Sequence, residues 1–178
     1  ESGGGLGSWK DVRISQSSVS ISSASAGQRG GGLRSLEDMS IRQSNITIST
    51  AVARQDGGAV SSHGQLHISE GNVTIFNTTA GESGGGLGCG KDMNISQSSV
   101  SISSASAGRR GGAVYSNGFL HIAEGNLTIS DAKAGESGGG LFSVEDMSIT
   151  QSSLSISTAG AGQRGGAVYS DGFLHIAE

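Results

Sequence analysis

Apolar and polar residues alternate along this chain in short runs. Residues 147–149 (MSI) and 154–156 (LSI) are two examples. A period of two residues places successive side chains on opposite faces, as in a β-strand. The pattern therefore predicts strands at 139–143, 146–150 and 153–157, separated by turns rich in Gly, Ser and Asn.

The alternating runs recur every 27 residues without a gap. The motif GG(A/G)(L/V) ends at Leu6, Leu33, Val60, Leu87, Val114, Leu141 and Val168. One isoleucine column contains Ile14, Ile41, Ile68, Ile95, Ile122, Ile149 and Ile176, and a second contains Ile21, Ile48, Ile75, Ile102, Ile129 and Ile156. A gapless repeat of this length is typical of solenoids, in which one unit cannot bury its own apolar face.

We therefore expect an all-β, right-handed parallel β-helix with three short strands in each rung. The right hand is the usual chirality of parallel crossovers. Residues 1–178 would form one domain of about six and a half rungs, at 3–29, 30–56, 57–83, 84–110, 111–137, 138–164 and, in part, 165–178. Stacking strand on strand makes each inward column a continuous aliphatic stack.

Two types of unit alternate from the second unit onward. The first type is represented by residues 138–164 (GGGLFSVEDMSITQSSLSISTAGAGQR) and the second by residues 111–137 (GGAVYSNGFLHIAEGNLTISDAKAGES). The chain opens with the last two positions of the second type and stops inside a unit, which we interpret as a window of a longer array. The register also brings Arg29 beside Asp56, and Glu82 beside Arg109 and Arg110, which favours this pairing of strands.

Composition and charge narrow the function classes. The net charge of -4 leaves no basic stripe, so nucleic acid is not an expected partner. No apolar run approaches the roughly 20 residues that span a bilayer, so this segment is not expected to cross a membrane. The single cysteine, Cys89, excludes an internal disulfide, and it replaces a serine in an otherwise constant column, which indicates a small buried filler.

The GGAV and GGGL tetrapeptides of all seven units resemble the GG(A/L/V/I) half-motif of chlamydial polymorphic outer-membrane proteins. Similar Gly-rich repeats occur in other parallel β-helix surface proteins. The resemblance implies a right-handed parallel β-helix that acts as a surface adhesin. The FxxN half of the family motif is absent, since Phe76 directly precedes Asn77, and Phe119 and Phe173 lie in FLHI.

The third strand of each unit predicts an outward face of small hydroxyls. Its central column contains Ser20, Thr47, Thr74, Ser101, Thr128 and Ser155, and a flanking column contains Ser22, Ser49, Ser103, Ser130 and Ser157, interrupted by Phe76. This flat, uncharged face is the candidate binding face. A regular hydroxyl lattice also resembles the ice-binding face of solenoid antifreeze proteins, although those favour the stiffer Thr. The simplest interpretation is a solvated strand face.

Five asparagines begin N-x-S/T sequons and are candidate N-glycosylation sites: Asn45, Asn72, Asn77, Asn94 and Asn126. Three of them, Asn45, Asn72 and Asn126, are also expected in the turn before the third strand. A left-handed backbone and a stacked amide ladder would explain their position there without any glycan.

No residues are expected to be catalytic, to bind a cofactor or to ligate a metal. His67, His121 and His175 share a column but lie two rungs apart, about 10 Å by the rung spacing. The carboxylates repeat along the array, whereas an enzyme needs a unique constellation. The sequence contains neither the Asp pairs and GHG or RIK motifs of pectinolytic β-helix enzymes nor the calcium-binding GGxGxDxUx repeat.

We therefore expect an extracellular or cell-surface structural or adhesive protein, not an enzyme. Its partner would be a cell-surface or polysaccharide ligand, or an ice surface in the alternative interpretation. A polysaccharide-active β-helix enzyme is the third and weakest hypothesis. End-to-end or lateral self-association through open strand edges is a further expectation.

Overall fold

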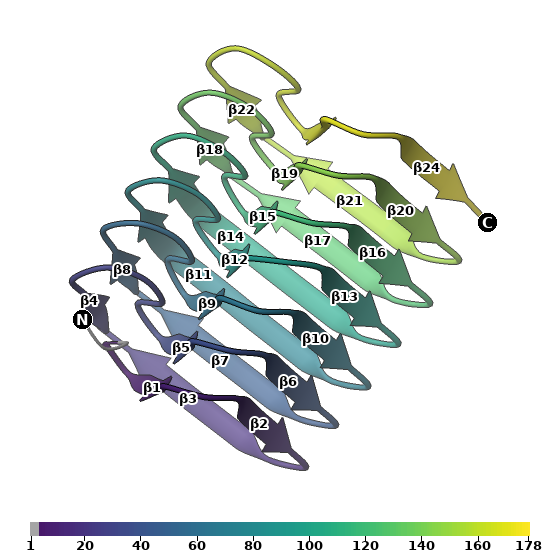
Figure 1. Ribbon diagram of the computed structural model, residues 1–178. Coiled ribbons are helices and arrows are strands. Elements are labelled where there is room, and N and C mark those ends of the chain that lie inside the picture. The colour runs from purple at the N-terminus through teal and green to yellow at the C-terminus, as the bar shows by residue number, and fades with distance from the viewer. Residues whose placement is uncertain (1–3) are drawn as a thin grey trace.

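The chain forms a parallel β-solenoid in which rungs of 27 residues stack along one axis (Figure 1). The computed structural model describes residues 4–178. Within that range there is no helix, and thus none that could cross a membrane. Each complete rung visits three sheets in turn before the chain moves up to the next rung. The expected fold class, a β-solenoid of stacked 27-residue coils, is confirmed.

The three sheets run the length of the solenoid. Sheet A contains β1 (Leu6–Ser8), β5 (Leu33–Ser35), β9 (Val60–Ser62), β12 (Leu87–Cys89), β15 (Val114–Ser116), β19 (Leu141–Ser143) and β23 (Val168–Ser170). Sheet B contains β2 (Val12–Ser15), β6 (Met39–Arg42), β10 (Leu66–Ser69), β13 (Met93–Ser96), β16 (Leu120–Ala123), β20 (Met147–Thr150) and β24 (Leu174–Ala177). The main strands of sheet C are β3 (Ser18–Ser22), β7 (Asn45–Ser49), β11 (Asn72–Ala80), β14 (Ser99–Ala107), β17 (Asn126–Ser130) and β21 (Ser153–Ser157).

Every strand pairs in parallel with its equivalent 27 residues along the chain. Ile68 has Ile41 and Ile95 as its Cα partners, and Ile75 has Ile48 and Ile102. The three strands expected in residues 138–164 are present as β19, β20 and β21. The first two begin later than expected, because Gly139 and Asp146 belong to the turns that precede them.

A short fourth strand extends sheet C and was not expected. It is separate in four rungs, as β4 (Ser25–Ala26), β8 (Val52–Ala53), β18 (Lys133–Ala134) and β22 (Gly160–Ala161), and continuous with the main strand in β11 and β14. The kink before it falls on a residue with positive φ, such as Thr50 or Ser104. Alternation stops at that residue, so the sequence gives no strand signal.

Left-handed residues turn the chain at three places in each rung. Glycine occupies one of these places, at Gly30, Gly57, Gly84, Gly111, Gly138 and Gly165. Glutamine or glutamate occupies the corner between sheets B and C, at Gln16, Gln43, Glu70, Gln97, Glu124 and Gln151. A left-handed backbone costs these L-residues roughly 1–2 kcal/mol each. Side-chain bonds between neighbouring rungs help offset that cost, as where Gln43 Nε2 donates to Glu70 Oε2 at 2.8 Å.

Aliphatic columns fill the interior. Both isoleucine columns are fully buried in the middle rungs, and Leu33, Val60, Leu87, Val114 and Leu141 line the same core from sheet A. Equivalent residues of the first and last rungs are partly or fully exposed, as at Leu6 and Ile176, because only one rung packs on them. Each rung therefore depends on its neighbours for burial, as in other solenoids.

The second glycine of each GG motif lies where two backbones meet. A Cβ placed on Gly112 would be 2.7 Å from the backbone of Lys133 in β18 and would also overlap the carbonyl oxygen of Gly139. Gly58 and Gly85 face the equivalent atoms in their own rungs. Because only backbone surrounds this position, a side chain has no free space there, which explains why it is glycine in every unit.

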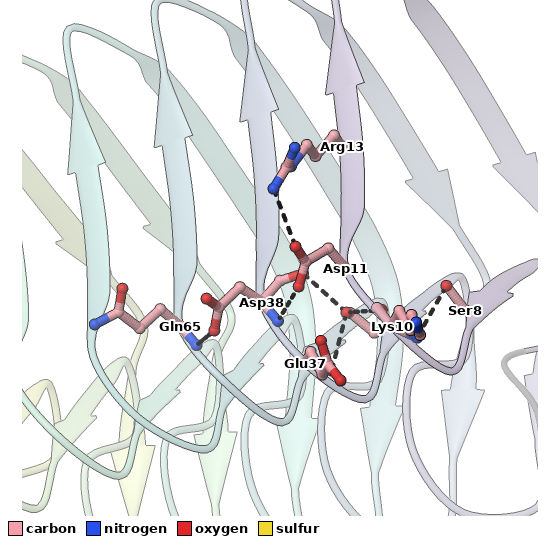
Figure 2. Close-up of polar contacts among 8 residues, drawn as sticks. Ser8, Lys10, Asp11, Arg13, Glu37, Asp38 and Gln65 are labelled. Atoms are coloured by element: carbon pink, nitrogen blue, oxygen red, sulfur yellow. Dashed lines mark hydrogen bonds and ion pairs between the residues drawn. The ribbon is translucent and has the colours of Figure 1, made fainter.

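An aspartate at the start of sheet B caps the next rung (Figure 2). Asp38 Oδ1 accepts a hydrogen bond from the backbone N–H of Gln65 at 2.8 Å, and Asp92 Oδ1 accepts one from Phe119 at 3.1 Å. The capped turns contain Gly64 and Gly118, where an added Cβ would overlap the Asp Oδ1 atom. Where a second-type unit follows a first-type unit, the glycine leaves room for the capping aspartate. Asp11 Oδ1 also accepts the backbone N–H of Asp38 at 3.3 Å between two first-type units, where Glu37 stands at the glycine position, so the cap itself does not require alternating units.

Candidate functional site

The outward side of sheet C carries the expected hydroxyl columns. The central column is in direct Cα register, with Ser20 opposite Thr47, Thr74 opposite Ser101 and Thr128 opposite Ser155. Five of its six residues are exposed, and the sixth, Ser101, is half-buried. We call this central column together with Ser22, Ser49, Ser103, Ser130 and Ser157 the hydroxyl face. The predicted outward orientation of these residues is confirmed.

Phe76 interrupts the hydroxyl face. Its side chain is 37% exposed, and its Cα partners are Ser49 and Ser103. The face therefore presents one aromatic ring in a field of small hydroxyls.

The sequons lie in different surroundings. Asn45, Asn72 and Asn126 are exposed and are the first residues of their strands. The expected left-handed turn conformation at these asparagines is wrong, because the positive φ belongs to Gln43, Glu70 and Glu124 two residues earlier. An amide ladder is present at one step, where Asn72 Nδ2 donates to Asn45 Oδ1 at 3.1 Å.

The other two sequons are placed less regularly. Asn77 is exposed and has a positive φ of 54° at the kink in β11. Asn94 is half-buried, and its Oδ1 atom is buried without a hydrogen-bond partner among the described residues. Attachment of a glycan requires an accessible side-chain amide, so Asn94 is the least favourable of the five positions.

The histidine column lies on the outer side of sheet B. His67 and His175 are exposed and His121 is half-buried, and each pairs in register with a non-histidine neighbour. Within residues 4–178, no group of three or more His, Cys, Asp or Glu side chains is arranged to hold a metal ion.

Cys89 faces inward from sheet A, as predicted, and is 3% exposed. Its Sγ atom lies 3.0 Å from the carbonyl oxygen of Gly64 and 3.2 Å from that of Asp92, so the thiol bonds to two rungs. The serines of the same column make the same pair of bonds, for example Ser62 to Glu37 and Gln65. Burial in this site raises the pKa of the Cys89 thiol from 9.0 to about 11.

In the folded chain near neutral pH, we expect the Cys89 thiol to resist an aromatic disulfide reagent, because only a thiolate attacks the disulfide. In denaturant the same thiol should react fully. As pH rises from 9.0 to about 11, the unfolded thiol ionises while the folded one stays protonated. The wild-type chain should therefore lose stability in that window relative to Cys89→Ser. Thiol labelling and urea unfolding at several pH values measure both effects. Rapid labelling of the folded chain would contradict the buried assignment.

The outward column of sheet A changes from each rung to the next. It consists of Gly7, Arg34, Ser61, Gly88, Tyr115, Phe142 and Tyr169. The segment that precedes each GG motif lies over it, so that Phe142 is 1% exposed although it points away from the core. The rings of Tyr115 and Phe142 stack with centroids 5.7 Å apart, and those of Phe142 and Tyr169 with centroids 5.6 Å apart.

A hollow of about 280 Å³ opens where this column is smallest. Gly88 and Gly90 contribute no side chain there, and Ser83 contributes only a small one. Asp56 and His63 lie on one side of the hollow, and Tyr115 and Asn117 on the other. We call it the Gly88 hollow. Unlike the hydroxyl face, it does not repeat along the solenoid.

Ion pairs border the Gly88 hollow. Arg29 Nε lies 3.0 Å from Asp56 Oδ2 and forms an ion pair with it, although the two atoms are not aligned for a hydrogen bond. The prediction that Arg29 lies beside Asp56 is therefore confirmed. Burial is the largest influence on Asp56 and raises the pKa of its carboxyl, while the charge of Arg29 acts in the opposite direction.

Glu82 lies beside Arg109 and Arg110 as expected, but it does not form their ion pairs. Glu82 stacks in register, since its carbonyl oxygen accepts the backbone N–H of Arg109 at 2.7 Å. The ion pairs go instead to Glu136 in the following rung, at 3.1 Å from Arg109 Nε and 3.7 Å from Arg110 Nε. Either rung was within reach of these long side chains, so register alone did not decide between them.

Sequence reasoning found the hydroxyl face and missed the Gly88 hollow. The signal was present in the LGCG segment at residues 87–90, which replaces larger residues at two outward positions of its neighbours. Its meaning depends on the segment that covers sheet A, and the alternation of apolar and polar residues does not place that segment over the outward column. Comparison of the chain with models of known families, with curated proteins and with solved structures finds no match.

Proposed function

We propose that this solenoid is an extracellular structural or adhesive element that binds a cell surface or a polysaccharide through the hydroxyl face. The observation that carries the proposal is the in-register column of exposed Ser and Thr along sheet C. Hydroxyls both donate and accept hydrogen bonds, so a straight row of them suits a polymer or surface with a repeating polar pattern. The proposal is for a non-enzymatic protein.

Paired substitutions in the same rungs test this proposal. Thr74→Arg with Thr128→Arg places two large charged side chains on the hydroxyl face. His67→Arg with His121→Arg places the same side chains on sheet B and serves as the matched control. We expect the threonine pair to reduce retention of the chain on cells or immobilised polysaccharide at least about tenfold, and the histidine pair to leave it unchanged. Equal retention of both variants and wild type would exclude the hydroxyl face.

Ice binding is the second candidate, because the central column has the regular rung spacing of a lattice, roughly 4.8 Å. Thermal hysteresis of the wild-type chain, lost in the threonine pair and kept in the histidine pair, would support it. Absence of hysteresis in the wild type would remove it. Phe76 and the half-buried Ser101 reduce the regularity of the face and make this candidate the weaker one.

A further inference from the structure

The aromatic stack on the outer side of sheet A ends abruptly at Gly88. Phe142 covers one face of the Tyr115 ring. The Cα partner of Tyr115 on the other side is Gly88, which has no side chain to cover the opposite face. The Gly88 hollow therefore lies at the open end of a three-ring stack, in the place where a fourth ring would continue it.

The size of the Gly88 hollow suits one ring. Its volume of about 280 Å³ is just below the ~300 Å³ at which pockets for drug-sized molecules begin. Gly88 lies one rung from Tyr115 and one rung from Ser61, so a further ring over Gly88 would continue the stack, whose successive centroids are 5.6–5.7 Å apart.

The walls favour a neutral ligand with many hydroxyls. Three arginines are balanced by three carboxylates in and beside the hollow: Arg29, Arg109 and Arg110 against Asp56, Glu82 and Glu136. Because these formal charges cancel, neither a strong anion nor a strong cation is selected. Among residues 4–178, Glu82 forms no ion pair, so its carboxylate remains an acceptor. His63, held by Arg29 Nη1 at 3.1 Å, and Asn117, whose Oδ1 accepts the Tyr115 hydroxyl at 2.9 Å, add further polar atoms.

We propose that the Gly88 hollow binds a pyranose unit of a neutral saccharide, with the sugar ring lying against the open face of Tyr115. A pyranose has an apolar C–H face that packs on an aromatic ring and hydroxyls around its edge that bond to polar walls. The hydroxyls meet Asp56 and His63 on one side and Asn117 on the other. This site is separate from the hydroxyl face and does not depend on the function proposed for that face.

The test is an NMR titration of the full chain with neutral hexoses, N-acetylhexosamines and their disaccharides. At least one sugar should shift the Gly88 amide and the Tyr115 ring signals, while signals of Thr74 and Thr128 stay in place. Tyr115→Ala removes the platform and should weaken binding at least about tenfold. Tyr115→Phe, which keeps the ring, should restore most of the affinity.

Two further variants separate binding from folding. Tyr169→Ala removes a half-buried tyrosine from the same stack, two rungs away from the hollow, and should bind sugar like the wild type. Asn117→Ala changes an exposed residue and should weaken binding while leaving the fold intact. The proposal is overturned if no sugar shifts the hollow, if Tyr115→Ala and Asn117→Ala bind as tightly as the wild type, or if p-cresol occupies the hollow while every sugar fails.

Discussion

Gly112→Ala should lower the free energy of unfolding by about 3 kcal/mol, the upper part of the range for overpacking a tight site. The added methyl would meet the Gly139 carbonyl oxygen and the Lys133 backbone, the latter at 2.7 Å. Neither neighbour is a side chain that could rotate away. The clash must therefore separate the short strand β18 from the start of sheet A. Chemical unfolding followed by circular dichroism measures the loss.

The third position of the same motif provides the matched control. Ala59 and Ala113 occupy it in second-type units, whereas Gly86 occupies it in a first-type unit. Gly86→Ala should cost less than Gly112→Ala, about 1 kcal/mol, because its Cβ would approach only one backbone atom closely, the Ala113 carbonyl oxygen at 2.9 Å, and otherwise the Ile102 side chain. If Gly112→Ala and Gly86→Ala were equally stable, close backbone approach would not explain the motif.

Gly118→Ala should cost about 2 kcal/mol through a different contact. The new methyl would displace Asp92 Oδ1 from the backbone N–H of Phe119, breaking the cap between the two unit types. Asp92→Ala alone should cost about 1 kcal/mol for the lost hydrogen bond. The double variant should lose less than the sum of the two, since the methyl then has no carboxylate to displace.

Gly27→Ala is the control for this series. No atom lies within 4 Å of a Cβ built at Gly27, and its φ is not positive. The substitution should be neutral or slightly stabilising, because alanine restricts the unfolded chain more than glycine does. Additive losses for Gly118→Ala and Asp92→Ala in the unfolding experiment would show that the two residues act independently, and that the capping aspartate is not the reason for glycine at position 118.

The register of the solenoid could be predicted from the sequence because every rung must bury the same apolar columns. A shift of one residue would turn the column of Ile41, Ile68 and Ile95 from the core to solvent, so only one pairing buries it. The same argument placed Thr47 and Thr74 outward, and the constancy of its serine column placed Cys89 inward. These residues obey alternation, which can be read along the chain without knowledge of neighbouring rungs.

Structural features that depend on contacts between different positions of the repeat could not be predicted from the sequence. The left-handed conformation of Gln43 and Glu70 has no local signature, and their side chains bond to each other only after the rungs stack. The fourth strand begins after a similar kink, at which the alternation is lost. The Gly88 hollow is the extreme case, because it arises from a departure from the repeat and not from the repeat itself.

The parallel ladder also determines how this protein responds to mechanical tension. The backbone hydrogen bonds of the sheets join each rung to the rungs directly before and after it, and they run roughly along the solenoid axis. A force that pulls the two ends apart along that axis loads the bonds of a terminal rung first and opens them one after another. Each detached rung of 27 residues then releases roughly 90 Å of extended chain. We therefore expect the solenoid to lengthen in steps under load while the remaining rungs stay folded.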